Sequence, residues 1–212
     1  MSDRLQRSWG ALTPSRAVEY LRTYGAPSAT SRVLTAEVIE ELAGRRPVRL
    51  LDLGCGNGQM LELFRERGMD LDYTGVDFSE PLLTAARERF ADDPRARFIA
   101  ADVNDPQGVD GGYDIALYSH VLEILSSPEA SLRRARDLAR HTVIRFFEPP
   151  EHDVDVVELR EMEIGDGTTV PYLRRKIARD SYRLMLARLG CTAVDVYRDE
   201  GSVDQVHVLR YR

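Results

Sequence analysis

The stretch VRLLDLGCGNGQMLELFRERG, from Val48 to Gly68, carries the strongest structural signal in this chain of 212 residues. Its apolar first part is typical of a buried strand, and glycines follow at alternate positions 54, 56 and 58. The residues after the glycines have the spacing of an amphipathic helix. Because glycine lacks a Cβ, the turn can approach a ligand closely, and the free N–H groups of the helix attract an anionic group. The stretch therefore predicts a strand, a tight turn and a helix that bind a nucleoside cofactor.

The glycine spacing and a preceding carboxylate indicate which nucleoside binds. Dinucleotide-binding turns read G-x-G-x-x-G, whereas this turn reads G-x-G-x-G and follows Asp52. A carboxylate at Asp52 would repel a pyrophosphate and attract a ligand that carries positive charge. S-adenosylmethionine (SAM) has both an ammonium and a sulfonium. The turn therefore favours SAM over a nicotinamide dinucleotide.

Length and composition predict one domain, because 212 residues with 43% hydrophobic content are too few for two full-sized α/β domains. The formal net charge of −6 works against the counterion release that drives most nucleic-acid binding. Neither Cys55 nor Cys191 has a neighbour at metal-ligand spacing, and no run approaches the roughly 20 apolar residues that span a bilayer. We expect a cytoplasmic monomer or homodimer without a metal, a membrane or a nucleic acid as partner.

Alternating strand and helix patterns predict a mainly parallel sheet with helices on both faces. Two helices come first: one begins at Thr13-Pro14 and ends at Gly25, and the other begins at Ser28 or Ser31 and ends at Gly44. The predicted parallel strands cover residues 48–53, 71–77, 96–102, 113–119 and 142–147. The helices between them are expected at 58–67, after a cap at Ser79, and after Ser127-Pro128.

The pattern changes after Pro149. Residues 156–164 and 169–177 alternate apolar with charged side chains around a GDG turn, which predicts a β-hairpin. A helix over 181–189 and two antiparallel strands, 192–197 and 203–211, are expected to follow. We predict one domain with four parts, in which the first and third cover the site as lids: 1–47 helical, 48–148 cofactor-binding core, 149–178 hairpin insertion, and 179–212 C-terminal helix and hairpin.

Four motifs together resemble the class I SAM-dependent methyltransferases that act on small molecules: LLDLGCGNGQ, GVDFS, AADV and YDIALYSHVLEIL, between Val48 and Leu125. The resemblance implies a Rossmann-like α/β fold. Its seven-stranded sheet would have six parallel strands and an antiparallel last strand. SAM would lie across the carboxyl ends of the first four strands, and S-adenosylhomocysteine would be the product.

The resemblance also implies which residues bind the methionine end of SAM. Ser119 and His120 would lie near the sulfonium. Apart from the resemblance, the position of Tyr24 and Arg32 ahead of the first strand predicts that they reach the methionine carboxylate. The residues that would hold the rest of the methionine moiety are Asp52, Gly54, Cys55, Gly56 and Gly58. In the alternative interpretation, Cys55 is only a small residue in a crowded turn.

Four further residues would bind the nucleoside. Asp77 would accept hydrogen bonds from the ribose hydroxyls, as an acidic residue about 20 positions downstream does in the dinucleotide fold. Phe78 would lie against the adenine, and Asp102 and Val103 would frame the adenine edge. The alternative for Asp77 is an Asx turn, and the alternative for Asp102 is the cap of a turn.

Methyl transfer needs an aligned acceptor lone pair more than it needs acid–base groups. An acceptor hydroxyl or ammonium must still lose a proton, and the candidate bases are His120, Tyr118, Glu148 and His152. We predict His120 as the catalytic residue, with a histidine satisfied by backbone groups as the alternative.

The charge pattern after the fifth strand bears on the acceptor. Between Glu148 and Asp166 the chain has eight carboxylates and a single arginine, Arg160, which favours an amine-bearing acceptor if these acids face the site. The bases that follow can pair with the acids across the hairpin and cancel their field. These bases are Arg174, Arg175, Lys176 and Arg179.

Three functions remain open from sequence. Small size and acidic charge favour an N- or O-methyltransferase for a small molecule, such as a natural product or metabolite. An RNA or protein methyltransferase needs a broad basic surface or a further domain. A SAM-binding protein without methyl transfer needs only the cofactor residues. A dehydrogenase is disfavoured by the glycine spacing and by Asp52.

Overall fold

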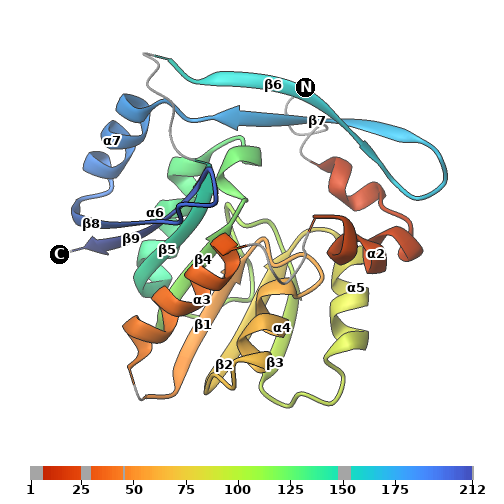
Figure 1. The fold of residues 1–212 in the computed structure, drawn as a ribbon, viewed down its shortest axis with the longest axis horizontal. Coiled ribbons are helices and arrows are strands. Elements are labelled where there is room, and N and C mark those ends of the chain that lie inside the picture. The colour runs from red at the N-terminus through yellow and green to blue at the C-terminus, as the bar shows by residue number, and fades with distance from the viewer. Residues whose placement is uncertain (1–6, 25–29, 45, 148–153, 212) are drawn as a thin grey trace.

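A twisted sheet of seven strands in the order β3-β2-β1-β4-β5-β9-β8 forms the centre of the molecule in Figure 1. The computed structural model describes residues 7–24, 30–44, 46–147 and 154–211. The strands of this sheet are β1 (Val48–Leu53), β2 (Leu71–Asp77), β3 (Ala96–Ala100), β4 (Tyr113–Ser119), β5 (Ala139–Phe147), β8 (Cys191–Arg198) and β9 (Asp204–Tyr211). Pairings among β1 to β5 are parallel, and β9 is antiparallel to both β5 and β8. The predicted sheet, with its antiparallel last strand, is confirmed.

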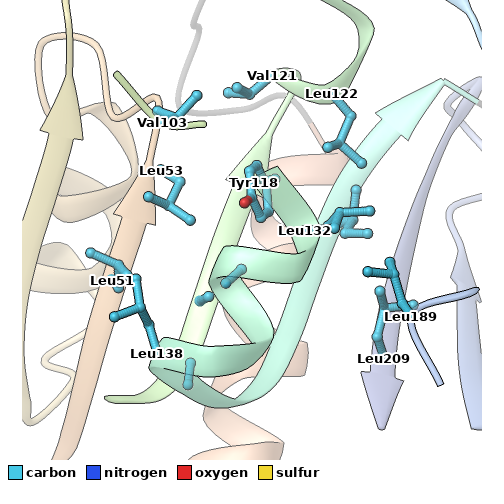
Figure 2. Packing of buried hydrophobic residues seen from close by; sticks show 14 of the residues in the cluster. Leu51, Leu53, Val103, Tyr118, Val121, Leu122, Leu132, Leu138, Leu189 and Leu209 are labelled. Carbon is cyan, nitrogen blue, oxygen red and sulfur yellow. The ribbon is translucent and has the colours of Figure 1, made fainter. Parts of the chain in front are cut away.

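Helices cover both faces of the sheet, which explains why the inner strands are apolar on both sides. The helices are η1 (Arg7–Ala11), α2 (Pro14–Tyr24), α3 (Thr30–Ala43), α4 (Gln59–Glu66), α5 (Glu80–Arg89), η2 (Leu122–Ile124), α6 (Pro128–Leu138) and α7 (Arg179–Arg188). On one face, Ile39 of α3 and Phe64 of α4 belong to the same core as Leu50 of β1. On the other face, Leu132 of α6 belongs to the same core as Leu51 of β1 (Figure 2).

The predicted hairpin is a separate two-stranded sheet, β6 (Val156–Glu163) and β7 (Thr169–Lys176), which runs along the top of the molecule in Figure 1. Near its turn it packs on the N-terminal helices. Met162 is buried with Leu12 and Leu82, and the Thr13 N–H donates to the Ile164 carbonyl at 2.8 Å. The hairpin is therefore anchored near its turn, and its role as a lid stays a prediction.

Several element boundaries differ from the sequence predictions. Ser79 precedes α5, but its side chain caps nothing, because its Oγ donates to the Trp9 carbonyl at 2.8 Å. The 3₁₀ helix that contains Trp9 was not predicted. Strand β5 begins at Ala139, directly after α6, earlier than predicted. The predicted boundaries at Gly25 and Ser28 lie outside the described residues. No helix in the described ranges is long and apolar enough to cross a bilayer.

Candidate active site

A cavity of about 460 Å³ lies at the carboxyl ends of β1, β2, β4 and β5, against the hairpin. The chain leaves β1 toward β2, while β4 lies on the other side of β1, so the loops diverge at this point. Ligands of open α/β sheets bind at such a switch point. The predicted site residues that line the cavity are Asp52, Gly54, Cys55, Gly56, Asp77, Phe78, Asp102, Val103, Ser119 and His120.

The glycines of the turn have different roles. Gly56 has a φ of 55°, and a Cβ placed on it would meet no atom within 4 Å, so this part of the turn borders open space. Gly58 has a φ of 83°, and its Cβ would lie 2.6 Å from the ring of Phe90. Gly58 therefore makes room for Phe90, and the structure does not bring it to the cavity wall as the resemblance implied.

Asp52 is a buried carboxylate at the end of β1. The Tyr73 hydroxyl donates to its Oδ2 at 2.7 Å, and its Oδ1 has no hydrogen-bond partner among the described residues. Burial raises the pKa of Asp52 to about 7; the Tyr73 hydrogen bond opposes this shift, and the charge of Asp77 adds to it. A positively charged ligand group at Oδ1 would favour the ionised form.

Arg145 of β5 also lines the cavity, although sequence reasoning did not find it. Its side chain is buried, its Nη1 donates to the Ser31 hydroxyl at 3.2 Å, and its Nε has no partner among the described residues. Burial and repulsion from Arg32 lower its pKa to about 10. The sequence does contain a signal for Arg145, namely an arginine inside the apolar run TVIRFF. Arginine is rarely buried unless its charge is paired.

Arg32, which was predicted to reach the methionine carboxylate, lies on α3, donates to the Gln59 side chain and lines the cavity. The Tyr24 side chain is outside the described part of the chain. Asp52 and Arg145 thus offer an unsatisfied buried acceptor and an unsatisfied buried donor on the same cavity. These groups fit the ammonium and carboxylate of an α-amino acid, which is the methionine end of SAM.

Asp77 ends β2, forms the Asx turn given as its alternative and also lines the cavity, so its contact with the ribose stays a prediction. Its Oδ1 accepts from the Ser79 N–H at 2.9 Å, which is an Asx turn, and its Oδ2 accepts from the Gly56 N–H at 2.9 Å. Burial raises the pKa of Asp77, and the backbone hydrogen bonds limit that rise. Backbone hydrogen bonds from Ser79, Gly56 and Phe78 still leave lone-pair capacity on the carboxylate for a ligand hydroxyl.

Asp102 likewise closes a turn and borders the cavity. Its Oδ1 accepts from the Asn104 N–H at 2.8 Å, as the turn-cap alternative predicted. The Val103 side chain next to it is buried and lines the same cavity. Phe78 is 37% exposed there, so its ring presents a surface to a ligand.

His120 is held between two carboxylates. Its Nδ1 lies 2.9 Å from Glu123 Oε1, its Nε2 lies 3.0 Å from Asp204 Oδ2, and its φ of 57° is unusual for a non-glycine residue. Burial alone lowers the pKa of His120, but hydrogen bonds with Asp204 and Glu123 outweigh this effect and raise it. An imidazolium that donates to both acids has no free lone pair, so the geometry argues against the predicted catalytic base.

Tyr118 is not a base in this structure. Its hydroxyl donates to the Ser131 carbonyl at 2.9 Å, and Figure 2 shows its ring between Leu53 and Leu132 in the core. Burial raises the pKa of this hydroxyl. The side chain packs against α6 and does not line the cavity, so that prediction is wrong. The other two candidate bases, Glu148 and His152, lie outside the described residues.

Aromatic side chains from three distant segments complete the cavity wall, and none was predicted. Trp9 of η1 and Tyr172 of β7 have ring centroids 5.5 Å apart. Phe147 ends β5, and the Arg174 guanidinium lies 5.2 Å from its ring centroid. Within the described ranges, no group of three or more His, Cys, Asp and Glu side chains is placed to hold a metal ion.

Comparisons with known proteins support this description. Residues 50–142 match the family model described as "Methyltransferase domain". Pyochelin synthetase PchF of Pseudomonas aeruginosa is 34% identical over 138 residues, which cover 58% of this chain and 8% of that protein. Trans-aconitate 2-methyltransferase of Acidovorax sp. is 36% identical over 69 residues, which cover 32% of this chain and 26% of the relative. The matches therefore span well under two thirds of these relatives.

Among solved structures, SAM-bound CalS10, an amino pentose methyltransferase from Micromonospora echinaspora, has the same fold. The TM-score is 0.67 at 20% identity, over 91% of this chain and 96% of that one. The match over residues 50–142 spans less than half of this chain, and together with the sheet order and the glycine turn it supports a class I SAM-dependent methyltransferase domain.

Proposed function

We propose that this protein transfers the methyl group of SAM to an oxygen or nitrogen of a small molecule, a natural product or metabolite. The observation that carries the proposal is the pair of buried opposite charges, Asp52 and Arg145, beside the glycine turn. Each has one polar atom without a partner among the described residues. Such atoms are costly to bury unless a ligand satisfies them.

Different cavity residues would bind different parts of the cofactor. Asp52 would hold the ammonium, Arg145 and Arg32 the carboxylate, and Asp77 the ribose hydroxyls. The adenine would lie between Phe78 and the turn at Asp102 and Val103. When bound, SAM supplies a methyl group on a positively charged sulfur.

The remaining cavity wall would orient the acceptor and exclude water, which are the main contributions an enzyme makes to this displacement. A His120 imidazolium bound to two acids has no free lone pair, and Tyr118 does not line the cavity. The described residues would therefore align the acceptor with the methyl group and would not take its proton. The names of two relatives agree with a small acceptor, because trans-aconitate and an amino pentose are small molecules.

The amine-bearing acceptor predicted from the acidic run gains no support from the described hairpin. Glu158 accepts hydrogen bonds from Arg174 at 2.6 Å and from Lys176 at 2.8 Å, and Asp155 lies 4.0 Å from Arg175. These bases pair with the acids as the sequence suggested. The pairing cancels the negative field on which the amine prediction depends.

Titration calorimetry with S-adenosylhomocysteine and with NADH tests the cofactor assignment. We expect binding of the first and none of the second. The Asp77→Asn variant should lose affinity for S-adenosylhomocysteine, whereas Asp114→Asn should bind normally, because Asp114 accepts from the Arg49 N–H away from the cavity. Tight binding of NADH alone would overturn the proposal. Release of S-adenosylhomocysteine from SAM with a pool of small acceptors then tests the transfer.

A further inference from the structure

The charged side chains on the cavity wall come from two regions, the strand ends with their turns and the hairpin. Three carboxylates, Asp52, Asp77 and Asp102, lie on the strand ends and turns that would hold the cofactor. The hairpin contributes two cations, Arg160 and Arg174. These two arginines, named the basic wall here, lie outside the proposed cofactor contacts, whereas Arg32 and Arg145 lie within them, and Glu161 of the hairpin also lines the cavity.

The basic wall belongs to one face of the hairpin. Glu158 pairs with Arg174 across the two strands, and Arg160 pairs with Tyr172. Directly opposite residues share a face, so these four side chains and Met162, two residues further along β6, lie on the same side. Met162 is buried against the N-terminal helices, which shows that this side faces the body of the protein.

On this face a single carboxylate is shared by three cations. Glu158 lies 2.6 Å from Arg174, 2.8 Å from Lys176 and 3.8 Å from Arg160. Hydrogen bonds from Lys176 and Arg174 lower the pKa of Glu158 to about 2, so it stays ionised. The four groups together carry two positive charges in excess. Glu161, the hairpin carboxylate on the cavity wall, still leaves one charge uncompensated.

Arg174 is placed to present this excess charge to a ligand. Its guanidinium lies over the Phe147 ring, and its hydrogen bonds to Glu158 use Nε and Nη2. The edge that carries Nη1 remains for a second acceptor. Apolar side chains adjoin it on the cavity wall, among them Ile124 and Tyr172. A guanidinium fixed beside apolar surface suits an organic anion with an apolar body.

We propose that the methyl acceptor is a small carboxylic acid whose carboxylate is held by Arg174 and Arg160 of the hairpin. This inference rests on the proposed function, since it assigns the acceptor end of the same cavity. It reverses the charge that the acidic run of the sequence suggested. The reason is that Glu158, on the inward face of the hairpin, is shared by three bases, more than one carboxylate can neutralise.

The test uses matched triplets of candidate acceptors, each with one carbon skeleton bearing a hydroxyl and either a carboxylate, a carboxamide or an aminomethyl group. Aromatic and aliphatic skeletons are both included. Binding to the protein loaded with S-adenosylhomocysteine is measured by calorimetry, and methyl transfer from SAM by mass spectrometry. We expect the acid of at least one triplet to bind at least about tenfold more tightly than its amide or amine, as charge-assisted hydrogen bonds require.

Matched variants test whether Arg174 binds the carboxylate of the acceptor. Arg174→Gln should weaken binding of that acid about tenfold or more, and Arg174→Lys should restore part of the loss. Arg175→Gln removes the same charge from the next residue, which does not line the cavity, and should leave acid binding unchanged. All three variants should bind S-adenosylhomocysteine like the wild type.

Three results would contradict the carboxylic-acid acceptor and still agree with the proposed function. These are equal or tighter binding of the amide or the amine, no binding of any acid, or equal effects of Arg174→Gln and Arg175→Gln. In each of these cases the wild type would still bind S-adenosylhomocysteine. Failure of that binding would instead contradict the proposed function itself.

Discussion

Asp52 is a single carboxylate whose charge depends on the ligand. Burial raises its pKa to about 7 in the free protein, so a substantial fraction is protonated near neutral pH. Binding of an ammonium favours the ionised form. The affinity for S-adenosylhomocysteine should therefore fall as pH decreases below 7, by up to about tenfold per pH unit. Calorimetry over a pH series measures this dependence.

The Asp52→Asn variant is the control for that experiment. It should bind more weakly at neutral pH and lose this pH dependence, because an amide does not titrate. Asp114→Asn should keep the wild-type profile. A wild-type affinity that stays constant between about pH 5.5 and 8 would show that Asp52 does not meet a cation there.

His120 should stabilise the fold in a pH-dependent way. Its pKa is raised above 6.5 by Asp204 and Glu123, against the effect of burial. A raised pKa means that the stabilisation is fully present below about pH 6.5 and is lost as pH rises through the folded-state value. His120→Asn, which tolerates the positive φ, should cost about 1–3 kcal/mol at pH 6 and less at pH 9. Urea unfolding at both values tests this, and an equal cost at both would contradict it.

Two glycines of one turn should respond differently to alanine. Gly58→Ala would place a Cβ 2.6 Å from the Phe90 ring, so we expect a loss of about 2 kcal/mol or more in stability with little change in ligand affinity. Gly56→Ala has open space for its Cβ and should lose less stability, but the methyl would project toward the ligand and weaken its binding. Thermal unfolding and calorimetry on both variants separate the two roles. The reverse ranking would show that the roles are exchanged.

At the scale of elements, the hairpin should open independently of the sheet. Met162 is 3% exposed and ties β6 to the N-terminal helices, whereas Leu159 on the same strand is 66% exposed. Met162→Ala should weaken this anchor by about 2–4 kcal/mol, and Leu159→Ala should change little. Hydrogen exchange should then accelerate in β6 and β7 but stay slow in β1 and β4. Equal acceleration throughout would mean that hairpin and sheet unfold together.

Elements with strong periodicity were predictable from sequence. β1, β2 and β4 match their predicted residues, because buried parallel strands are continuous apolar runs that end at polar residues or glycine turns. The hairpin was predictable from alternation around the GDG turn. The 3₁₀ helix at Arg7–Ala11 was not, since five residues show no period. The start of β5 was missed because α6 enters it without a turn residue.

For the whole molecule, ligand binding should raise thermal stability. A ligand that binds only the folded state adds about 2.7 kcal/mol at a hundredfold excess over its Kd. For a chain of 212 residues this corresponds to a rise in Tm of roughly 5–10 °C. S-adenosylhomocysteine should produce this shift in differential scanning fluorimetry, and NADH should not. A shift of the same size with both would contradict a SAM-selective cavity.

The chain encodes its architecture and most of its proposed cofactor contacts locally. The glycine turn, Asp52, Asp77 and the strand ends are recognisable because each depends on residues close in sequence and on the geometry of one βα unit. The charge of the acceptor end, by contrast, depends on which groups meet across the fold. Glu158 is shared by Arg174 and Lys176 across the hairpin, and His120 meets Asp204 from a distant strand. Electrostatic fields depend on distances between side chains, and linear sequence does not contain those distances until the chain has folded.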